Sequence, residues 1–291
     1  MPMKEVLFTG ACTALVTPFA GRQVNHPMME KLLTRQLENG IKSVVVCGTT
    51  GESPTLSDKE KLELFRRCKA YAGSDMQIIC GTGSNNTAHA IELSIAAQEA
   101  GADALLVVSP YYNKANPEGL YLHYISIANA VNIPVIIYNV PGRTGVDIPV
   151  TVYKELSKVP NIAGVKEAST DIVKIAKIRN ACGEDLPIWS GNDDQAVAAM
   201  ALGAKGVISV LSNVCPKETA IMAQAALEED YQTASRLQCQ MLPLIEALFA
   251  DVNPIPVKVA MELIGLDCGP CRLPLGPVSQ QVKQRLENLL K

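Results

Sequence analysis

Short apolar runs, rich in β-branched residues, recur eight times in the first 210 residues of the chain. Each run is continuously apolar instead of alternating between apolar and polar positions. Such runs are typical of strands that are buried on both faces, and therefore of a parallel sheet. The predicted strands cover residues 12–17, 43–47, 77–80, 104–108, 134–138, 162–166, 188–190 and 207–210.

Segments with a helical period separate these runs. One of them opens at Ser57, where a glutamate three positions on completes the sequence pattern of a capping box. The other predicted helices of this region cover residues 28–38, 87–100, 117–130, 151–157, 170–182, 194–202 and 217–228.

Strand followed by helix, eight times over, predicts a (β/α)₈ TIM barrel across residues 1–226. No strand pattern returns after that point. Helical stretches at 231–250, 257–264 and 279–290 predict an all-helical C-terminal domain over residues 227–291. The alternative is an open doubly wound sheet, which would have fewer strands and a glycine-rich first turn.

Composition narrows the class of protein. The 291 residues include 26 basic and 29 acidic side chains, and no cluster of positive charge favours a nucleic-acid or membrane-surface partner. The longest apolar runs are too short for a membrane helix. Nine cysteines, an odd number, lie largely in or beside apolar runs. We interpret them as reduced, buried thiols, which predicts a cytoplasmic location.

The active site of a parallel barrel lies at the C-terminal ends of its strands. Lys166 ends the apolar run 162–166, so its stem could lie against the barrel interior. Burial disfavours the charged form of an amine, and a neutral amine can form a Schiff base with a ketone. The competing interpretation is a structural lysine that reaches solvent or pairs with Glu167.

Other polar residues follow strand ends at the same rim. Tyr138 could relay protons or be a core tyrosine. Thr49 and Thr50 lie in a glycine-flanked turn that could bind a carboxylate. Arg143 could bind a second carboxylate, or it could be a solvated surface arginine. No metal-ligand cluster, dinucleotide fingerprint or phosphate-binding loop is present in the sequence. These residues favour an enzyme that acts on carbonyl compounds through an imine, without a metal or cofactor.

The chain resembles the 4-hydroxy-tetrahydrodipicolinate synthase (dihydrodipicolinate synthase) family, which lies within the pyruvate-dependent class I aldolase and N-acetylneuraminate lyase superfamily. The resemblance spans essentially the full length. Its motifs are Gly48-Thr-Thr-Gly-Glu-Ser53, Pro110-Tyr-Tyr-Asn113, Tyr138-Asn-Val-Pro-Gly-Arg-Thr-Gly145, Gly164-Val-Lys-Glu-Ala168, Ser190-Gly191, Gly206-Val-Ile-Ser-Val210, Asn253-Pro-Ile-Pro-Val-Lys258 and Arg272-Leu-Pro-Leu275.

The resemblance implies a condensation of pyruvate with L-aspartate-4-semialdehyde in lysine and diaminopimelate biosynthesis, through a Schiff base on Lys166. It implies a proton relay of Tyr138, Thr49 and Tyr112, with Tyr112 entering the site of a neighbouring subunit. The implied substrate-binding residues are Thr50, Arg143, Gly191 and Ile208. It further implies a homotetramer built from two dimers and no cofactor beyond the substrate itself.

Two alternatives stay open at this point. One is another Schiff-base pyruvate aldolase or lyase that acts on a sugar acid or a hydroxy-oxo acid. The other is a non-catalytic relative that binds a keto acid. Retention of Lys166, Tyr138 and Thr49 argues against the second.

Many relatives are inhibited by L-lysine at a dimer-interface site. The corresponding positions here are Ser53, Asp58, Lys61, Asn85, His89 and Tyr111. The inhibited pattern has an acidic residue in place of His89, and an effector ammonium would meet the like charge of Lys61. We therefore expect weak or absent inhibition by L-lysine.

Cys268 and Cys271 have the spacing of a redox or zinc motif. However, they follow a helix instead of a strand, and the sequence offers no further ligands with matching spacing.

Overall fold

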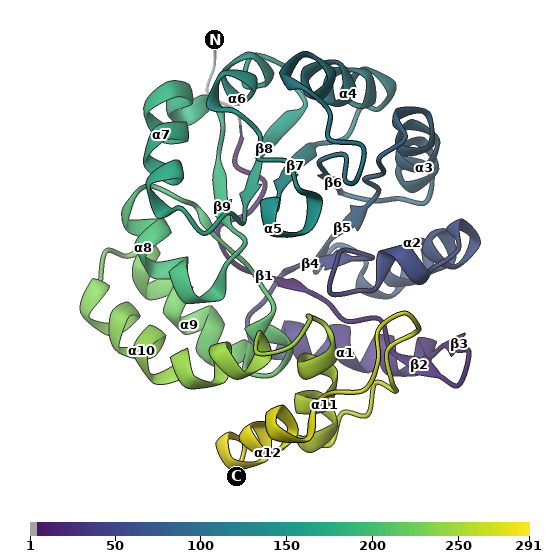
Figure 1. Ribbon diagram of the computed structural model, residues 1–291, viewed down its shortest axis with the longest axis vertical. Coiled ribbons are helices and arrows are strands. Elements are labelled where there is room, and N and C mark those ends of the chain that lie inside the picture. Colours follow the sequence, from purple (N-terminus) through teal and green to yellow (C-terminus); the bar gives the residue numbers. More distant parts are fainter. Residues whose placement is uncertain (1–4) are drawn as a thin grey trace.

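The computed structural model describes residues 5–291. Eight parallel strands close into a barrel whose order around the ring is β1-β10-β9-β8-β7-β6-β5-β4, and helices surround it (Figure 1). The predicted TIM barrel is therefore confirmed, and the open sheet is wrong. The barrel strands are β1 (Gly10–Ala14), β4 (Ser43–Val46), β5 (Gln77–Gly81), β6 (Ala104–Val108), β7 (Val135–Asn139), β8 (Ile162–Glu167), β9 (Ile188–Ser190) and β10 (Gly206–Ser209).

The helices of the barrel follow the predicted spacing closely. They are α1 (His26–Glu38), α2 (Asp58–Ala72), α3 (Thr87–Glu99), α4 (Pro117–Ala130), α6 (Val150–Leu156), α7 (Ile172–Cys182), α8 (Ala196–Ala201) and α9 (Pro216–Leu227). The capping box at Ser57 is confirmed, because the Ser57 side chain accepts from the Glu60 amide and the Glu60 carboxylate accepts from the Ser57 amide.

Three features differ from the sequence prediction. The first strand begins and ends earlier than residues 12–17, since its pairing with β10 starts at Gly10 and Gly206. A two-stranded hairpin, β2 (Phe19–Ala20) and β3 (Gln23–Val24), follows it. The loop after β7 contains a four-residue helix, α5 (Pro141–Thr144), that lies over the centre of the ring in Figure 1. Four residues are too few to show a helical period.

The C-terminal region is helical, as predicted. It contains α10 (Tyr231–Leu248), α11 (Ile255–Leu263) and α12 (Gln280–Leu289), which gather along one side of the barrel (Figure 1). The Gln238 side chain of α10 donates to the Asp193 carbonyl oxygen at 2.8 Å, so this region bonds directly to the barrel. The division into two domains at residue 226 stays a prediction. Within the described residues, no helix is both long and apolar enough to cross a bilayer.

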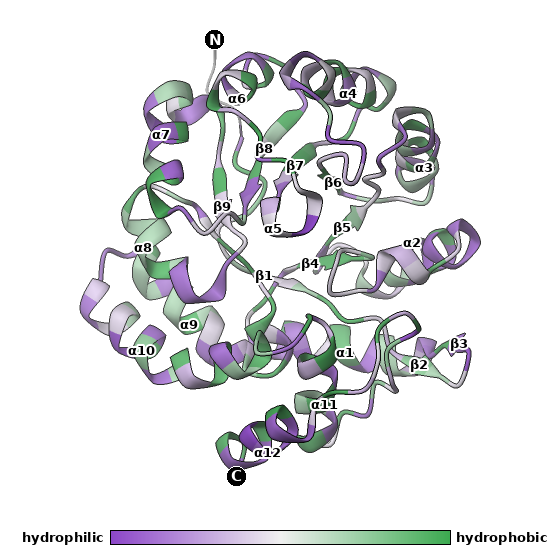
Figure 2. Ribbon diagram, viewed as in Figure 1, coloured by the Kyte–Doolittle hydropathy of each residue, from purple (hydrophilic) through white to green (hydrophobic). Residues whose placement is uncertain are grey.

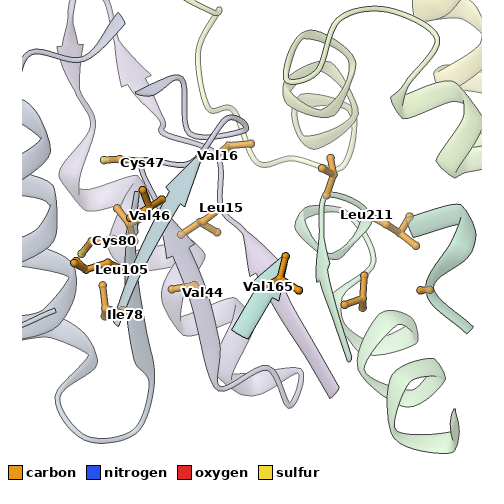
Figure 3. Packing of buried hydrophobic residues seen from close by; sticks show 14 of the residues in the cluster. Leu15, Val16, Val44, Val46, Cys47, Ile78, Cys80, Leu105, Val165 and Leu211 are labelled. Carbon is orange, nitrogen blue, oxygen red and sulfur yellow. The ribbon is translucent and has the colours of Figure 1, made fainter. Parts of the chain in front are cut away.

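Alternate side chains of each strand enter two different cores, as the pleat of a strand requires. Val44, Val46 and Ile78 belong to the large core between strands and helices, part of which Figure 3 shows. Val45 and Ile79 point into the barrel itself. Green, hydrophobic strands surrounded by helices of mixed colour are visible in Figure 2. Burial on both faces explains the continuous apolar runs of the sequence.

The cysteines behave mainly as buried apolar side chains. Cys12 lies inside the barrel, while Cys68 and Cys80 lie in the outer core. Burial raises the pKa of the Cys68 thiol to about 12, and burial also raises the pKa of Cys80 well above its usual range. Burial also raises the pKa of Cys268 to about 11 and, together with Glu52, that of Cys271 to about 12. Thiolates at either position are therefore scarce near neutral pH.

Candidate active site

Lys166 lies at the C-terminal end of β8, and only 5% of its surface is exposed. Its Nζ atom is 4.5 Å from the centroid of the Tyr138 ring, on the neighbouring strand β7. The side chain thus neither reaches solvent nor pairs with Glu167. A buried amine at the mouth of a barrel is positioned to act as a nucleophile.

A bulge in β8 gives Lys166 this orientation. Val135 pairs with Ile162, but the next residue of β7, Ile136, pairs with Gly164, so Ala163 is an extra residue. The shift by one position places Tyr138 opposite Lys166. In a regular ladder Tyr138 would face Val165, and the lysine would point toward the helices.

Glu167 is the next residue along β8 and points to the other face of the strand. Its buried carboxylate accepts hydrogen bonds from Asn139 Nδ2 at 2.8 and 3.1 Å and from the Tyr153 hydroxyl at 3.1 Å. Burial, with Glu167 close by, raises the pKa of Tyr153 well above its usual range, so the phenol remains a donor. The Asn139 amide also donates to Asp147, which forms an ion pair with Lys174. This network fixes the ends of β7 and β8.

A cavity of about 900 Å³ opens at the barrel mouth above Lys166. It brings together six of the eight predicted catalytic and substrate-binding residues, namely Lys166, Tyr138, Thr49, Thr50, Arg143 and Gly191. Ile208 is fully buried inside the barrel and does not line this cavity. Tyr112 lies outside the cavity as well, with 91% of its surface exposed and a positive φ of 70°.

Gly191 leaves room for the lysine. A Cβ atom at this position would lie 2.6 Å from the Ala168 Cβ and 3.0 Å from the Lys166 Cε. A side chain here would therefore displace the stem of Lys166. The backbone amide of Gly191 donates to the Glu167 carbonyl oxygen at 2.7 Å, which holds the loop after β9 against β8.

Asn253, in the segment between α10 and α11, is a site residue whose role the sequence did not reveal. Its side-chain amide donates to the Thr50 hydroxyl at 3.0 Å, and its backbone oxygen accepts from the Arg143 guanidinium at 3.2 Å. The C-terminal region thereby orients two residues of the mouth. The only signal in the sequence was the motif that starts at Asn253, because no local pattern predicts a contact across 203 positions.

The turn that carries Thr49 and Thr50 is held from below by Glu52. The Glu52 carboxylate is completely buried and forms an ion pair with Lys258 of α11, with 2.6 Å between Nζ and Oε1. Its second oxygen accepts from the Arg272 amide at 2.8 Å. The Lys258 ammonium also lies 4.2 Å from the centroid of the Phe19 ring. Here too, the C-terminal region supports the mouth of the barrel.

The positions that correspond to a lysine effector site lie beside a second cavity. Ser53, Asp58, Lys61, His89 and Tyr111 line it, whereas Asn85 bonds to the Tyr111 carbonyl oxygen from outside. The Asp58 carboxylate accepts from His89 Nε2 at 2.9 Å and lies 3.8 Å from Lys61 Nζ. Among residues 5–291, no group of three or more His, Cys, Asp or Glu side chains is placed to hold a metal ion.

The fold and the site are typical of barrel enzymes that act on carbonyl compounds through a buried lysine. The chain belongs to the dihydrodipicolinate synthetase family, whose model matches residues 7–291. It is a lyase-type enzyme of the class I aldolase kind, which confirms the family assignment made from the sequence.

Curated relatives and solved structures agree with this assignment. The chain is 43% identical to the 4-hydroxy-tetrahydrodipicolinate synthase of Acetivibrio thermocellus over 99% of this chain and 98% of the relative. The crystal structure of dihydrodipicolinate synthase from Aquifex aeolicus superposes with a TM-score of 0.95, at 40% identity and 97% coverage of both chains. A structure described as the first monomeric dihydrodipicolinate synthase variant also superposes with a TM-score of 0.95. The identity is 38%, and the superposition covers 98% of this chain and 96% of that chain.

Proposed function

We propose that this enzyme condenses pyruvate with L-aspartate-4-semialdehyde to 4-hydroxy-tetrahydrodipicolinate, with Lys166 as the nucleophile. Membership of the family and full-length similarity to curated synthases support this reaction in lysine and diaminopimelate biosynthesis. Nothing in the comparisons favours a sugar-acid lyase. The observation that carries the role of Lys166 is its burial at the mouth, beside the Tyr138 ring.

The proposed mechanism begins when the Lys166 amine attacks the pyruvate ketone and water is expelled. The resulting protonated imine acts as an electron sink, so the substrate methyl group loses a proton and becomes an enamine. The enamine carbon attacks the aldehyde of the second substrate. The amino group of that substrate then displaces Lys166 from the imine carbon, which closes the ring and frees the enzyme. Because the imine supplies the sink, the mechanism needs no separate cofactor.

We assign the proton relay to Tyr138, Thr49 and Tyr112. Tyr138 has the position for it, since its ring lies against the Lys166 ammonium and its side chain lines the mouth. A proton donor must come within hydrogen-bonding reach of the atom it serves. The exposed Tyr112 meets that condition only if it reaches the mouth of a neighbouring subunit.

The two substrate carboxylates are assigned to different residues of the same mouth. We assign the pyruvate carboxylate to the Thr49–Thr50 turn, where glycine-flanked backbone amides can bind an anion. We assign the semialdehyde carboxylate to Arg143, because a guanidinium binds a carboxylate through two parallel hydrogen bonds. Gly191 provides space at the imine, and Ile208 contributes through its backbone at the end of β10.

We propose that this chain forms a homo-oligomer, namely a tetramer that is built from two dimers. The largely exposed ring of Tyr112, with its positive φ, supports an intersubunit role, because a tyrosine ring that is 91% exposed in one chain gains from burial against another. The description of one related structure as a monomeric variant is in keeping with larger assemblies elsewhere in the family.

We further propose that L-lysine inhibits this enzyme weakly or not at all. The Asp58 carboxylate is already engaged by His89 and Lys61, so an effector ammonium would find no free carboxylate there. Initial rates with and without millimolar L-lysine test this directly. Strong inhibition would show that the pocket accepts an ammonium despite Lys61.

Reductive trapping tests the central assignment. Borohydride treatment with pyruvate should add one reduced pyruvyl group, which peptide mass spectrometry should place on Lys166. The Lys166→Ala variant should give no adduct, while Lys177→Ala, on the exposed face of α7, should be labelled normally. An adduct that persists in Lys166→Ala would overturn the mechanism. Product analysis with sugar aldehydes in place of the semialdehyde separates the synthase from the alternative lyase.

A further inference from the structure

Near the mouth, a side chain holds the ends of β9 and β10 together in place of strand pairing. The last residue pair of these two strands joins Ser190 to Val207, so the ladder stops before β10 ends. Asp193, which follows β9, closes the gap. Its Oδ2 atom accepts from the Val210 amide at 2.8 Å and from the Leu211 amide at 3.0 Å.

This bridge lies next to two residues that we assign to the imine. Gly191, two positions before Asp193, approaches the Lys166 stem, since an added Cβ atom would lie 3.0 Å from Lys166 Cε. Ile208, two positions before Val210, belongs to the barrel interior. By joining the two loops, Asp193 determines how far apart the backbones of Gly191 and Ile208 lie.

Asp193 also contributes a buried charge on the Lys166 side of the barrel. Only 2% of the residue is exposed, and it does not line the mouth cavity. Burial raises the pKa of Asp193, whereas hydrogen bonding and the nearby charge of Lys166 lower it. A buried anion needs hydrogen-bond donors or a countercharge, and so does a buried cation. The carboxylate and the ammonium therefore stabilise each other.

The other acidic residues around the mouth are engaged elsewhere. Glu167 points to the opposite face of β8, where the network at the ends of β7 and β8 binds it. More than half of the Asp147 and Asp171 side chains is exposed, and each of the two pairs with a lysine of α7. Asp251 accepts from the amide of the next residue along the chain. Asp193 is thus the buried carboxylate best placed to act on Lys166.

We propose that Asp193 is a positioning residue of the reaction. Its carboxylate holds the ends of β9 and β10 beside Lys166, and its charge stabilises the protonated imine relative to the neutral imine. When the methyl C–H bond breaks, its electron pair forms the C=C bond of the enamine, and the C=N π pair moves to the nitrogen. That step is fast only from the protonated imine, whose nitrogen is cationic. The proposal rests on the Schiff base at Lys166.

Two substitutions in the full-length enzyme separate the bridge from the charge. Asp193→Asn removes the charge and keeps a side-chain oxygen that can accept from both amides. Its kcat should fall at least tenfold, whereas the KM for pyruvate should change by a smaller factor. Asp193→Ala also removes the bridge, so kcat should fall further and the KM should rise. Asp194→Asn, at the exposed neighbouring position, is the matched control and should behave as the parent does.

A spectroscopic measurement reports the charge at the imine directly. We would label the enzyme with ¹⁵N-lysine and pyruvate with ¹³C at the ketone carbon, and record the solid-state NMR signal of the bonded nitrogen. The parent should give the chemical shift of a protonated imine, and Asp193→Asn should move it toward that of a neutral imine. A purely structural role of Asp193 would leave the signal of Asp193→Asn unchanged.

Three results would overturn the proposal: a parent-like kcat in Asp193→Asn, an unchanged nitrogen signal in that variant, and an equal loss of kcat in Asp194→Asn. If circular dichroism shows that Asp193→Asn misfolds, Asp193→Ser provides a second neutral acceptor for the same measurements. A parent enzyme that forms no pyruvate adduct would instead refute the proposed function. The failure of one inference is therefore distinguishable from the failure of the other.

Discussion

The buried ion pair of Glu52 and Lys258 offers a sharp test of how the C-terminal helices support the barrel. Neither side chain is more than 3% exposed, and 2.6 Å separates the charged atoms. Lys258→Met removes the cation and retains an apolar side chain of similar length beside Phe19. The Glu52 carboxylate would keep the neutral donors of the Arg272 amide and the Cys271 thiol and would lose its countercharge.

The magnitude follows from the geometry. At an effective dielectric constant of about 20, two charges separated by this distance attract by about 6 kcal/mol. Part of that attraction offsets the cost of removing both charges from water, and breaking a buried pair costs about 3–5 kcal/mol. With an unfolding entropy of about 2.1 cal/mol/K per residue, the melting temperature of this 291-residue chain should fall by about 5–8 °C.

Calorimetric melting at one fixed protein concentration measures the effect, since assembly makes melting temperatures depend on concentration. The double variant Glu52→Gln/Lys258→Met removes both charges and should recover at least half of the decrease in melting temperature. Lys59→Met, at an exposed position, controls for the chemistry of the substitution. Two results would refute the reasoning. One is a decrease of less than about 1 kcal/mol in the free energy of unfolding of the single variant, and the other is a double variant that is no more stable than the single one.

Three further changes have defined outcomes. Gly191→Ala should lower the rate of pyruvate adduct formation at least tenfold while the protein stays folded, because the new methyl group meets the Lys166 stem; an unchanged trapping rate would contradict this. Tyr112→Phe should lower synthase activity while adduct formation largely persists, and loss of folded protein would instead indicate a structural role. Burial lowers the pKa of His123 to about 4, so the folded state resists protonation. Stability that is fully present above about pH 6.5 should therefore be lost as the pH falls toward 4, by up to about 3 kcal/mol, and His123→Leu should flatten this dependence in urea titrations.

Periodicity predicted the barrel because burial on both faces leaves a strong local signal in each strand. The same reasoning placed Lys166 and Tyr138 at the mouth, since the ends of parallel strands meet there. It could not establish which way Lys166 points, because the register of β7 and β8 depends on the bulge at Ala163. The role of Asn253 was equally hidden, since it depends on a contact with a residue distant in sequence.

The position of Tyr112 shows a different limit. Its motif suggested a catalytic role, yet within one chain the ring lies outside the mouth cavity. A single sequence describes one subunit, whereas a site completed by a neighbour is a property of the assembly. Lys61 is a third case: the sequence identified the residue, but only the folded chain shows that its ammonium is buried at the end of a cavity.

The bulge in β8 has a consequence for the length of that strand. Ile162 and Lys166 are four positions apart, yet Ile162 packs toward the helices while Lys166 faces the interior. The parity of the strand changes between them, at Ala163. Deletion of Ala163 would restore a regular ladder and leave Lys166 opposite Tyr138. Deletion of Val165 would instead turn the Lys166 amine outward, toward the helices, and bring the Glu167 carboxylate into its place. The chemistry at this mouth is therefore encoded in the count of residues along β8 as much as in their identity.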